Sequence, residues 1–93
     1  MNISNTEEKL SKIETEDGFF ERFHENGQLE RRGNYVDGKP DGLWEGFDEN
    51  GQLRWRENFI DGEREGLFEG FDENGQVWWR VNFIDGDLDE VSE

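Results

Sequence analysis

The chain of 93 residues has no cysteine, one proline, one methionine and one histidine. Without cysteine it has no disulfide framework, thiolate metal site or cysteine nucleophile, which suits the cytosol. No apolar run approaches the roughly 18–20 residues that span a bilayer, and we recognise no signal peptide. Basic residues are few, 10 against 25 acidic, and the net charge of −15 disfavours direct binding to nucleic acid or an anionic membrane. We therefore expect a cytoplasmic protein whose partner is a basic protein.

Hydrophobic residues are also scarce, at 30% of the chain, while 38% of the residues are charged. Such a composition lies close to that of disordered proteins. Aromatic residues, however, make up 14% of the chain, with eight Phe, four Trp and one Tyr. The length is sufficient for one small domain. We therefore expect a single folded domain with an aromatic core.

A repeat of 24 residues organises most of the chain. Three blocks align without a gap over residues 18–41, 42–65 and 66–89, each with a Glu-Asn-Gly-Gln tetrad and a later Asp-Gly pair. Asn-Gly and Asp-Gly both favour two-residue hairpin turns, and strand-length segments separate them. The pattern predicts an all-β fold, a single antiparallel meander sheet of about six strands. Residues 1–17 are expected to form a terminal cap, either a short helix or a strand, and residues 90–93 a frayed tail.

The turns also predict which residues pair. Two-residue Asn-Gly turns place an opposite-charge pair at the same position of every hairpin, a pairing that stabilises sheets. An Asp61-Gly62 turn would place Trp55 beside Phe68 in the next hairpin. The opposite-charge pairs are Glu21 with Arg32, Glu45 with Arg56 and Glu69 with Arg80.

Strand alternation predicts two different faces of the sheet. One face is expected to carry Trp44, Trp55 and Trp79 together with the apolar residues Leu53, Phe59, Phe68, Val77, Val81 and Phe83. The other face is expected to carry the Glu–Arg pairs together with the remaining apolar residues, which are Leu43, Phe47, Ile60, Leu67, Phe71, Trp78 and Ile84.

The stretch from Asp41 to Leu53, Asp-Gly-Leu-Trp-Glu-Gly-Phe-Asp-Glu-Asn-Gly-Gln-Leu, resembles the MORN-variant repeat. The likeness covers residues 18–89, about three repeats. The resemblance implies an extended sheet of stacked hairpins. It also implies a choice of functions, because bacterial members are often labelled antitoxin or immunity proteins, and other members are structural scaffolds. This sequence departs from the family by carrying Glu63 and Asp87 where relatives often have lysine.

The residues give little support for catalysis. His24 is the only histidine, and Asp48 and Asp72 stand at its place in the other repeats, so we interpret it as a turn residue rather than a general base. The run from Asp85 to Asp89 resembles the start of a calcium loop, but Glu90 stands where glycine is needed. The glycines form no phosphate-binding loop. We predict a protein that is not an enzyme, with no catalytic residue, no metal and no cofactor.

The acidic residues are the most informative feature. The three repeats carry net charges of −1, −4 and −5 although they share one scaffold. Acidic side chains also keep an exposed sheet soluble, but that need does not explain the increase along the chain. Trp78 is adjacent to Trp79 in a strand and is expected on the more polar face, as an exposed contact residue. The predicted partner-binding residues are Asp48, Glu49, Asp61, Glu63, Glu65, Asp72, Glu73, Trp78, Asp85, Asp87 and Asp89.

Two classes of function follow. The first is an inhibitor that blocks the basic groove of a toxin or nuclease, either an immunity or antitoxin protein or a phage-encoded nucleic-acid mimic directed at a host defence nuclease. The second is a structural scaffold for protein–protein contacts. Because electrostatic complexes weaken as ionic strength rises, salt dependence distinguishes the two classes. The sheet edges or one face would also allow a homodimer.

Overall fold

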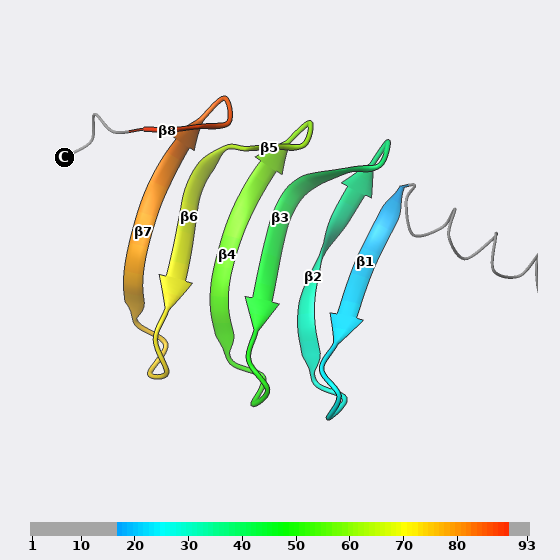
Figure 1. Cartoon of the computed structure of the whole chain (residues 1–93), viewed down its shortest axis with the longest axis vertical. Helices are drawn as coiled ribbons and strands as arrows, with labels where there is room; N and C mark the ends of the chain where they lie inside the picture. Colours follow the sequence, from blue (N-terminus) through cyan, green and yellow to red (C-terminus); the bar gives the residue numbers. More distant parts are fainter. Residues whose placement is uncertain (1–16, 90–93) are drawn as a thin grey trace, which may run out of the picture.

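The computed structural model describes residues 17–89, so the expected cap before residue 17 and the expected tail over residues 90–93 lie outside the described residues. One open antiparallel sheet accounts for this part of the chain, which has no helix (Figure 1). The predicted all-β meander is therefore confirmed. The strands are β1 (Gly18–Phe23), β2 (Leu29–Val36), β3 (Lys39–Phe47), β4 (Leu53–Ile60), β5 (Glu63–Arg64), β6 (Gly66–Phe71), β7 (Val77–Ile84) and β8 (Asp87–Leu88).

The sheet has eight strands rather than about six. The two additional strands, β5 and β8, are only two residues long. The spatial order is β1-β2-β3-β4-β6-β7-β8, with β5 paired to β4. The pairs β1–β2, β3–β4 and β6–β7 are referred to below as the first, second and third hairpins. Their Asn-Gly loops, the tips of the hairpins, lie along one edge of the sheet, and the Asp-Gly turns lie along the other (Figure 1).

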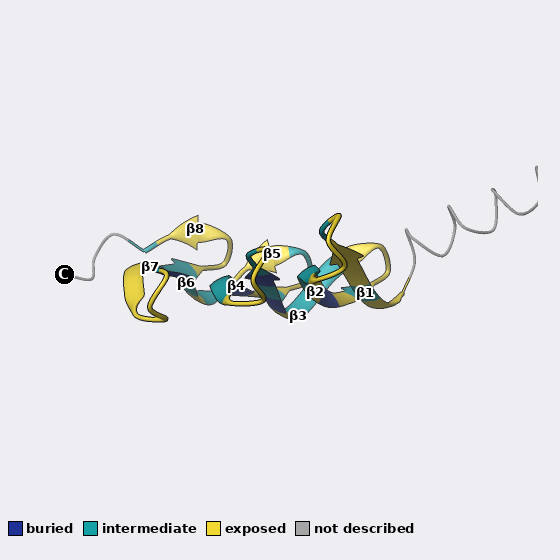
Figure 2. Cartoon of the chain, turned by 90° about the horizontal axis from the view of Figure 1, so that it is seen from below, coloured by how far each residue is buried: buried dark blue, intermediate teal, exposed yellow. Residues whose placement is uncertain are grey.

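The sheet is a single layer. Seen edge-on it is a thin band, and β5 and β8 stand out of its plane on one side (Figure 2). Among the described residues, Trp44 and Phe71 are the only large apolar side chains that are buried, at 5% and 8% exposure. Stabilising contacts therefore lie between neighbouring strands rather than between layers.

The two kinds of turn differ. Asp37, Asp61 and Asp85 have positive φ angles of 54°, 56° and 53°, and each precedes a glycine with positive φ. This is the predicted two-residue turn. At the tips, the two-residue prediction is wrong, because the Asp48 N–H bonds the Gln52 carbonyl at 2.9 Å across a three-residue loop. In that loop only the glycine has positive φ.

The predicted register within the hairpins is nevertheless confirmed, because a one-residue bulge beside each tip compensates for the longer loop. In the second hairpin Phe47 pairs with Leu53, the register then shifts, and Gly46 pairs with Trp55. The first and third hairpins show the same shift. All three predicted Glu–Arg pairs are register partners.

Because of the same bulge, the predicted composition of the two faces is wrong for two residues. Leu53 and Val77 are register partners of Phe47 and Phe71, and directly opposed residues share a face. Leu53 also lines one hollow with Phe71 and Arg56. Their predicted placement with the tryptophans is wrong, because the extra residue of a bulge reverses the alternation.

The predicted register between the second and third hairpins is also wrong. Trp55 lies opposite Gly70 rather than Phe68. Ile60 pairs with Glu63 beside the turn, as a two-residue turn requires. Between Arg64 and Glu69, however, the chain has two residues more than the facing segment of β4, so the pairing shifts and Arg56 faces Glu69. The additional length lets the turn region leave the plane of the sheet (Figure 2). Neighbouring turn regions are bonded there, through Gly62 N–H to Pro40 O and Gly86 N–H to Arg64 O, both at 3.1 Å.

Three strand glycines make room for three tryptophan rings. A Cβ atom on Gly46 would lie 2.1 Å from the ring of Trp55, far inside contact distance. The same holds for Gly33 with Trp44 at 1.9 Å and Gly70 with Trp79 at 2.3 Å. Each ring therefore fills the space that a side chain on the glycine would need, an arrangement that compensates for glycine in a strand.

We expect Gly46→Ala to lower the free energy of unfolding by about 1–3 kcal/mol, because the added methyl group displaces the Trp55 ring. Urea unfolding followed by circular dichroism measures the effect. The first hairpin has the pair Arg22–Arg31 at this place, so Trp55→Arg supplies a matched background. In the Trp55→Arg background, Gly46→Ala should lower the free energy of unfolding by less than about 1 kcal/mol. Equal losses in both backgrounds would contradict the packing explanation.

Candidate functional site

A ladder of alternating charge crosses one face of the sheet, which we call the ladder face. Most of its ion pairs join neighbouring hairpins rather than the two strands of one hairpin. Arg32 Nε lies 3.0 Å from Glu45 Oε1, and Arg56 Nε lies 3.1 Å from Glu69 Oε1. Within a hairpin, the only predicted pair that forms a salt bridge among the described residues joins Arg80 to Glu69, at 2.9 Å. In spatial order the ladder is Glu21, Arg32, Glu45, Arg56, Glu69 and Arg80.

Glu69 is the most strongly held member of the ladder. It is 6% exposed and accepts hydrogen bonds from Arg56 on one side and Arg80 on the other. The Arg56 hydrogen bond is the main reason that the pKa of Glu69 lies below its ordinary value, and Arg80 adds to it while burial opposes it. The Arg56 guanidinium also lies 5.5 Å from the centre of the Phe71 ring. This part of the ladder is therefore structural.

The other arginines of the described residues are also engaged within the sheet. Arg64 pairs with Glu57 at 2.7 Å and lies 5.2–5.8 Å from the rings of Phe59, Phe68 and Phe83. Arg31 lies 5.7 Å from the ring of Phe20. The remaining pairs are Arg22 with Glu30 at 3.5 Å and Arg54 with Asp48 at 3.4 Å.

The turns present carboxylates that are not neutralised in this way. Six of the predicted partner-binding carboxylates are exposed, and none of the six forms a salt bridge with another residue in the range 17–89. They lie in the turns, along the two opposite edges of the sheet (Figure 1). Glu49 and Glu73 lie at the tips, and Asp61, Glu63, Asp85 and Asp87 lie at the Asp-Gly edge.

Other predicted partner-binding residues hold turns in place. Asp48 Oδ1 accepts backbone N–H bonds from Asn50 and Gln52 at 2.9 and 3.0 Å. The pKa of Asp48 lies below its ordinary value, mainly because of the Gln52 N–H, with smaller contributions from Asn50 and Arg54. Asp72 makes the same two bonds in the third hairpin, Glu65 accepts the Asp85 N–H at 2.9 Å, and Asp89 is bonded to Asn82.

Trp78 is 70% exposed. It lies beside the bulge of the third hairpin, in β7, the last long strand of the sheet. The sequence predicted an exposed side chain here, and the exposure agrees with that prediction.

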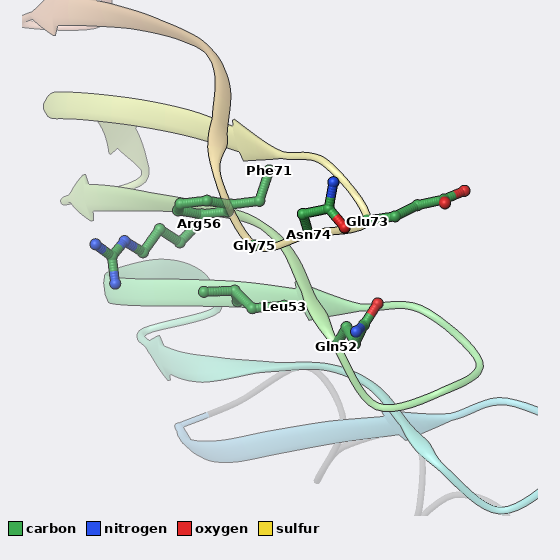
Figure 3. Close-up of a pocket in the computed structure, with 7 residues that line it drawn as sticks. All are labelled: Gln52, Leu53, Arg56, Phe71, Glu73, Asn74 and Gly75. Carbon is green, nitrogen blue, oxygen red and sulfur yellow. The ribbon is translucent and has the colours of Figure 1, made fainter.

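The spacing between the hairpin tips is a feature that the sequence did not predict. The first and second tips are joined, because His24 Nε2 lies 2.9 Å from the Phe47 carbonyl oxygen and Asn26 donates to the Glu49 carbonyl at 2.9 Å. Asp48 stands at the place of His24 in the second hairpin and is turned into its own loop. A hollow of about 550 Å³, lined by Gln52, Leu53, Arg56, Phe71, Glu73, Asn74 and Gly75, lies between the second and third tips (Figure 3). We call it the tip hollow.

The fold defines the class of protein, an array of β-hairpin repeats in one open sheet. The family model of the MORN repeat variant matches residues 16–37, 40–61 and 64–85, which is more than half of the chain. The chain therefore belongs to the MORN repeat variant family. Repeats of this family are typically non-catalytic and are associated with protein interaction. Comparison with curated proteins and with solved structures finds no match.

Two further observations apply to residues 17–89. They contain no helix long and apolar enough to cross a membrane. They also contain no group of three or more histidine, aspartate or glutamate side chains arranged to hold a metal ion.

Glu69→Gln tests the ladder through its pH dependence. Because the pKa of Glu69 is lowered by folding, its ionised form stabilises the sheet above the pKa of the unfolded chain, and this contribution is lost as the pH falls through the lowered pKa. At neutral pH, the free energy of unfolding of the variant should be about 1–3 kcal/mol lower than that of wild type. It should also lose less stability than wild type between about pH 5 and pH 2. Urea unfolding across this range measures both effects.

Glu73→Gln is the matched control, because Glu73 is exposed and forms no salt bridge with another described residue. It should change the free energy of unfolding by less than about 0.5 kcal/mol. Identical pH profiles for the two variants would contradict a special role of Glu69.

Proposed function

We propose that the chain is a non-catalytic protein-binding module that holds a basic protein against the acidic edges of its sheet. The segregation of charge is the observation that supports this proposal. The arginines of residues 17–89 are engaged by strand carboxylates, by the loop carboxylate of Asp48 or by aromatic rings, whereas six exposed turn carboxylates have no cationic partner there. Both edges therefore present uncompensated negative charge to solvent, and such a field attracts and orients a basic partner.

One position in the repeat supports a functional origin of this charge. The second residue after each Asp-Gly turn aspartate is Lys39 in the first repeat, Glu63 in the second and Asp87 in the third. All three follow turns with the same positive φ angles. The fold therefore accepts either charge here, and the acidic residues of the second and third repeats are free to serve binding.

We propose further that binding inhibits the partner. A toxin or nuclease that acts on nucleic acid needs a basic groove, and a thin sheet with acidic residues along two opposite edges suits such a groove. An immunity or antitoxin protein and a nucleic-acid mimic against a defence nuclease are two forms of this inhibitor. A scaffold would bind its partner without inhibiting it.

The double variant Glu63→Lys with Asp87→Lys tests the acidic edge. The partner is first captured from the native host on the immobilised chain at low salt, identified and purified. The dissociation constant of the wild-type complex should rise steeply with ionic strength, and the double variant should associate about tenfold more slowly. Stopped-flow mixing measures the association rate.

Lys39→Glu is the matched control, since it places an acidic residue at the equivalent site of the first repeat. It should accelerate association. The free energy of unfolding of every variant should lie within about 0.5 kcal/mol of the wild-type value. Unchanged association rates in the double variant would overturn the proposed binding edge. If the bound partner kept its full activity, the proposal of inhibition would be overturned, and the proposal of a protein-binding module would remain.

A further inference from the structure

We infer that the tip hollow receives a long basic side chain, lysine or arginine, from the protein partner. This inference rests on the proposed function and specifies where on the sheet a basic protein is recognised. The hollow lies beside the acidic tips, between the second and third hairpins (Figure 3).

The two gaps between tips are bridged differently. Across the second gap, beside the tip hollow, Arg54 donates to the Phe71 carbonyl at 2.8 Å, whereas Glu30 stands at this place in the first repeat. In the first hairpin, His24 and Asn26 reach across to carbonyl groups of the second. Gln28 also fills the gap, with Oε1 only 3.2 Å from where a Cβ atom on Gly51 would lie. At the equivalent Gly75, no atom of the described residues lies within 4 Å of that point.

The chemistry of the tip hollow changes from apolar to acidic along its length. Leu53 and the buried Phe71 form the apolar part, and Glu73 points outward at the other end (Figure 3). A second hollow of about 530 Å³ continues from Glu73 along Asp48, Glu49 and Arg54, and the two hollows share Gln52, Glu73 and Asn74. The guanidinium of Arg54 is engaged there by Asp48 and by the Phe71 carbonyl.

This gradient matches a lysine or arginine side chain, which buries an apolar stem and keeps its charged end in a polar environment. The stem would lie on Leu53 and Phe71, and the charged end beside Glu73. Arg56 lines the hollow but does not repel such a group strongly, because its guanidinium is bonded to Glu69 and points away from Glu73 (Figure 3). An acidic side chain would meet Glu73 and is therefore excluded.

The experiment uses a short oligolysine peptide as the probe and the full chain as the receptor. Nuclear magnetic resonance should show nuclear Overhauser effects between the methylene protons of lysine and the methyl groups of Leu53. Glu73→Gln should raise the dissociation constant about threefold, as expected for an exposed ion pair. Glu25→Gln, at the same place in the first hairpin, should change it by less than about 1.5-fold.

Two variants of Asp48 separate the shape of the hollow from its charge. Because Arg54 occupies the Phe71 carbonyl, Asp48→His is combined with Arg54→Glu, which gives the second hairpin the two residues of the first. Asp48→Asn with Arg54→Glu changes the charge in the same way but keeps an acceptor for the loop N–H groups. At about pH 7.5, where imidazole is neutral, the histidine variant should lose the contacts to Leu53 and the asparagine variant should keep them. Circular dichroism confirms that both variants are folded.

The outcomes distinguish this inference from the proposed function. Binding of oligolysine without contacts to Leu53, or with equal effects of Glu25→Gln and Glu73→Gln, would overturn the tip hollow as the site and leave the acidic edges as the binding surface. Failure of the wild-type chain to bind either oligolysine or a basic protein at low salt would overturn the proposed function itself.

Discussion

A single-layer sheet has no second layer against which to bury side chains, and this constraint determines how the molecule is held together. Most folds bury one face of a sheet on another element, whereas here stability has to come from contacts between neighbouring strands. On one face, tryptophan rings occupy the space above strand glycines. On the ladder face, Arg32 and Arg56 bridge adjacent hairpins and lie against phenylalanine rings. Both devices connect a residue to its lateral neighbour, as expected for an array of repeats.

The same constraint determines where the negative charge is presented. Because the strands use arginine to connect hairpins, few cations are left to neutralise the turns. The acidic residues of the turns then lie at both edges of the sheet, where the turns are (Figure 1). Over residues 17–89 the charge is thus patterned, with an internally paired centre and two negative edges. This pattern is what a basic partner would recognise.

The sequence predicted the sheet and the pairing within hairpins because turn residues and alternation determine both. The three-residue tip and its bulge change the register by one residue in opposite directions, so Glu45 still faces Arg56. The pairing between hairpins was predicted wrongly, because Gly66, which has a positive φ angle and lies between Arg64 and Glu69, was not interpreted as a site where the pairing shifts. Asp48 was interpreted as a partner-binding residue since an aspartate that caps its own loop looks, in sequence, like any exposed acid. The tip hollow lies between the second and third tips, where Arg54 rather than a histidine crosses the gap, and residue spacing does not reveal this arrangement.

The contrast between His24 and Asp48 shows how a repeat array separates stability from recognition. Each hairpin contacts only its neighbours, so a substitution at one tip changes one gap and leaves the ladder intact. His24 joins two tips through a neighbour's carbonyl group. Asp48 instead satisfies N–H groups of its own loop, and Arg54 bonds the Phe71 carbonyl across the next gap. The register beyond the bulge is the same in both hairpins. The strands therefore maintain the fold while the tips are free to vary, and the edge that we propose for partner recognition is also the edge where variation costs the sheet least.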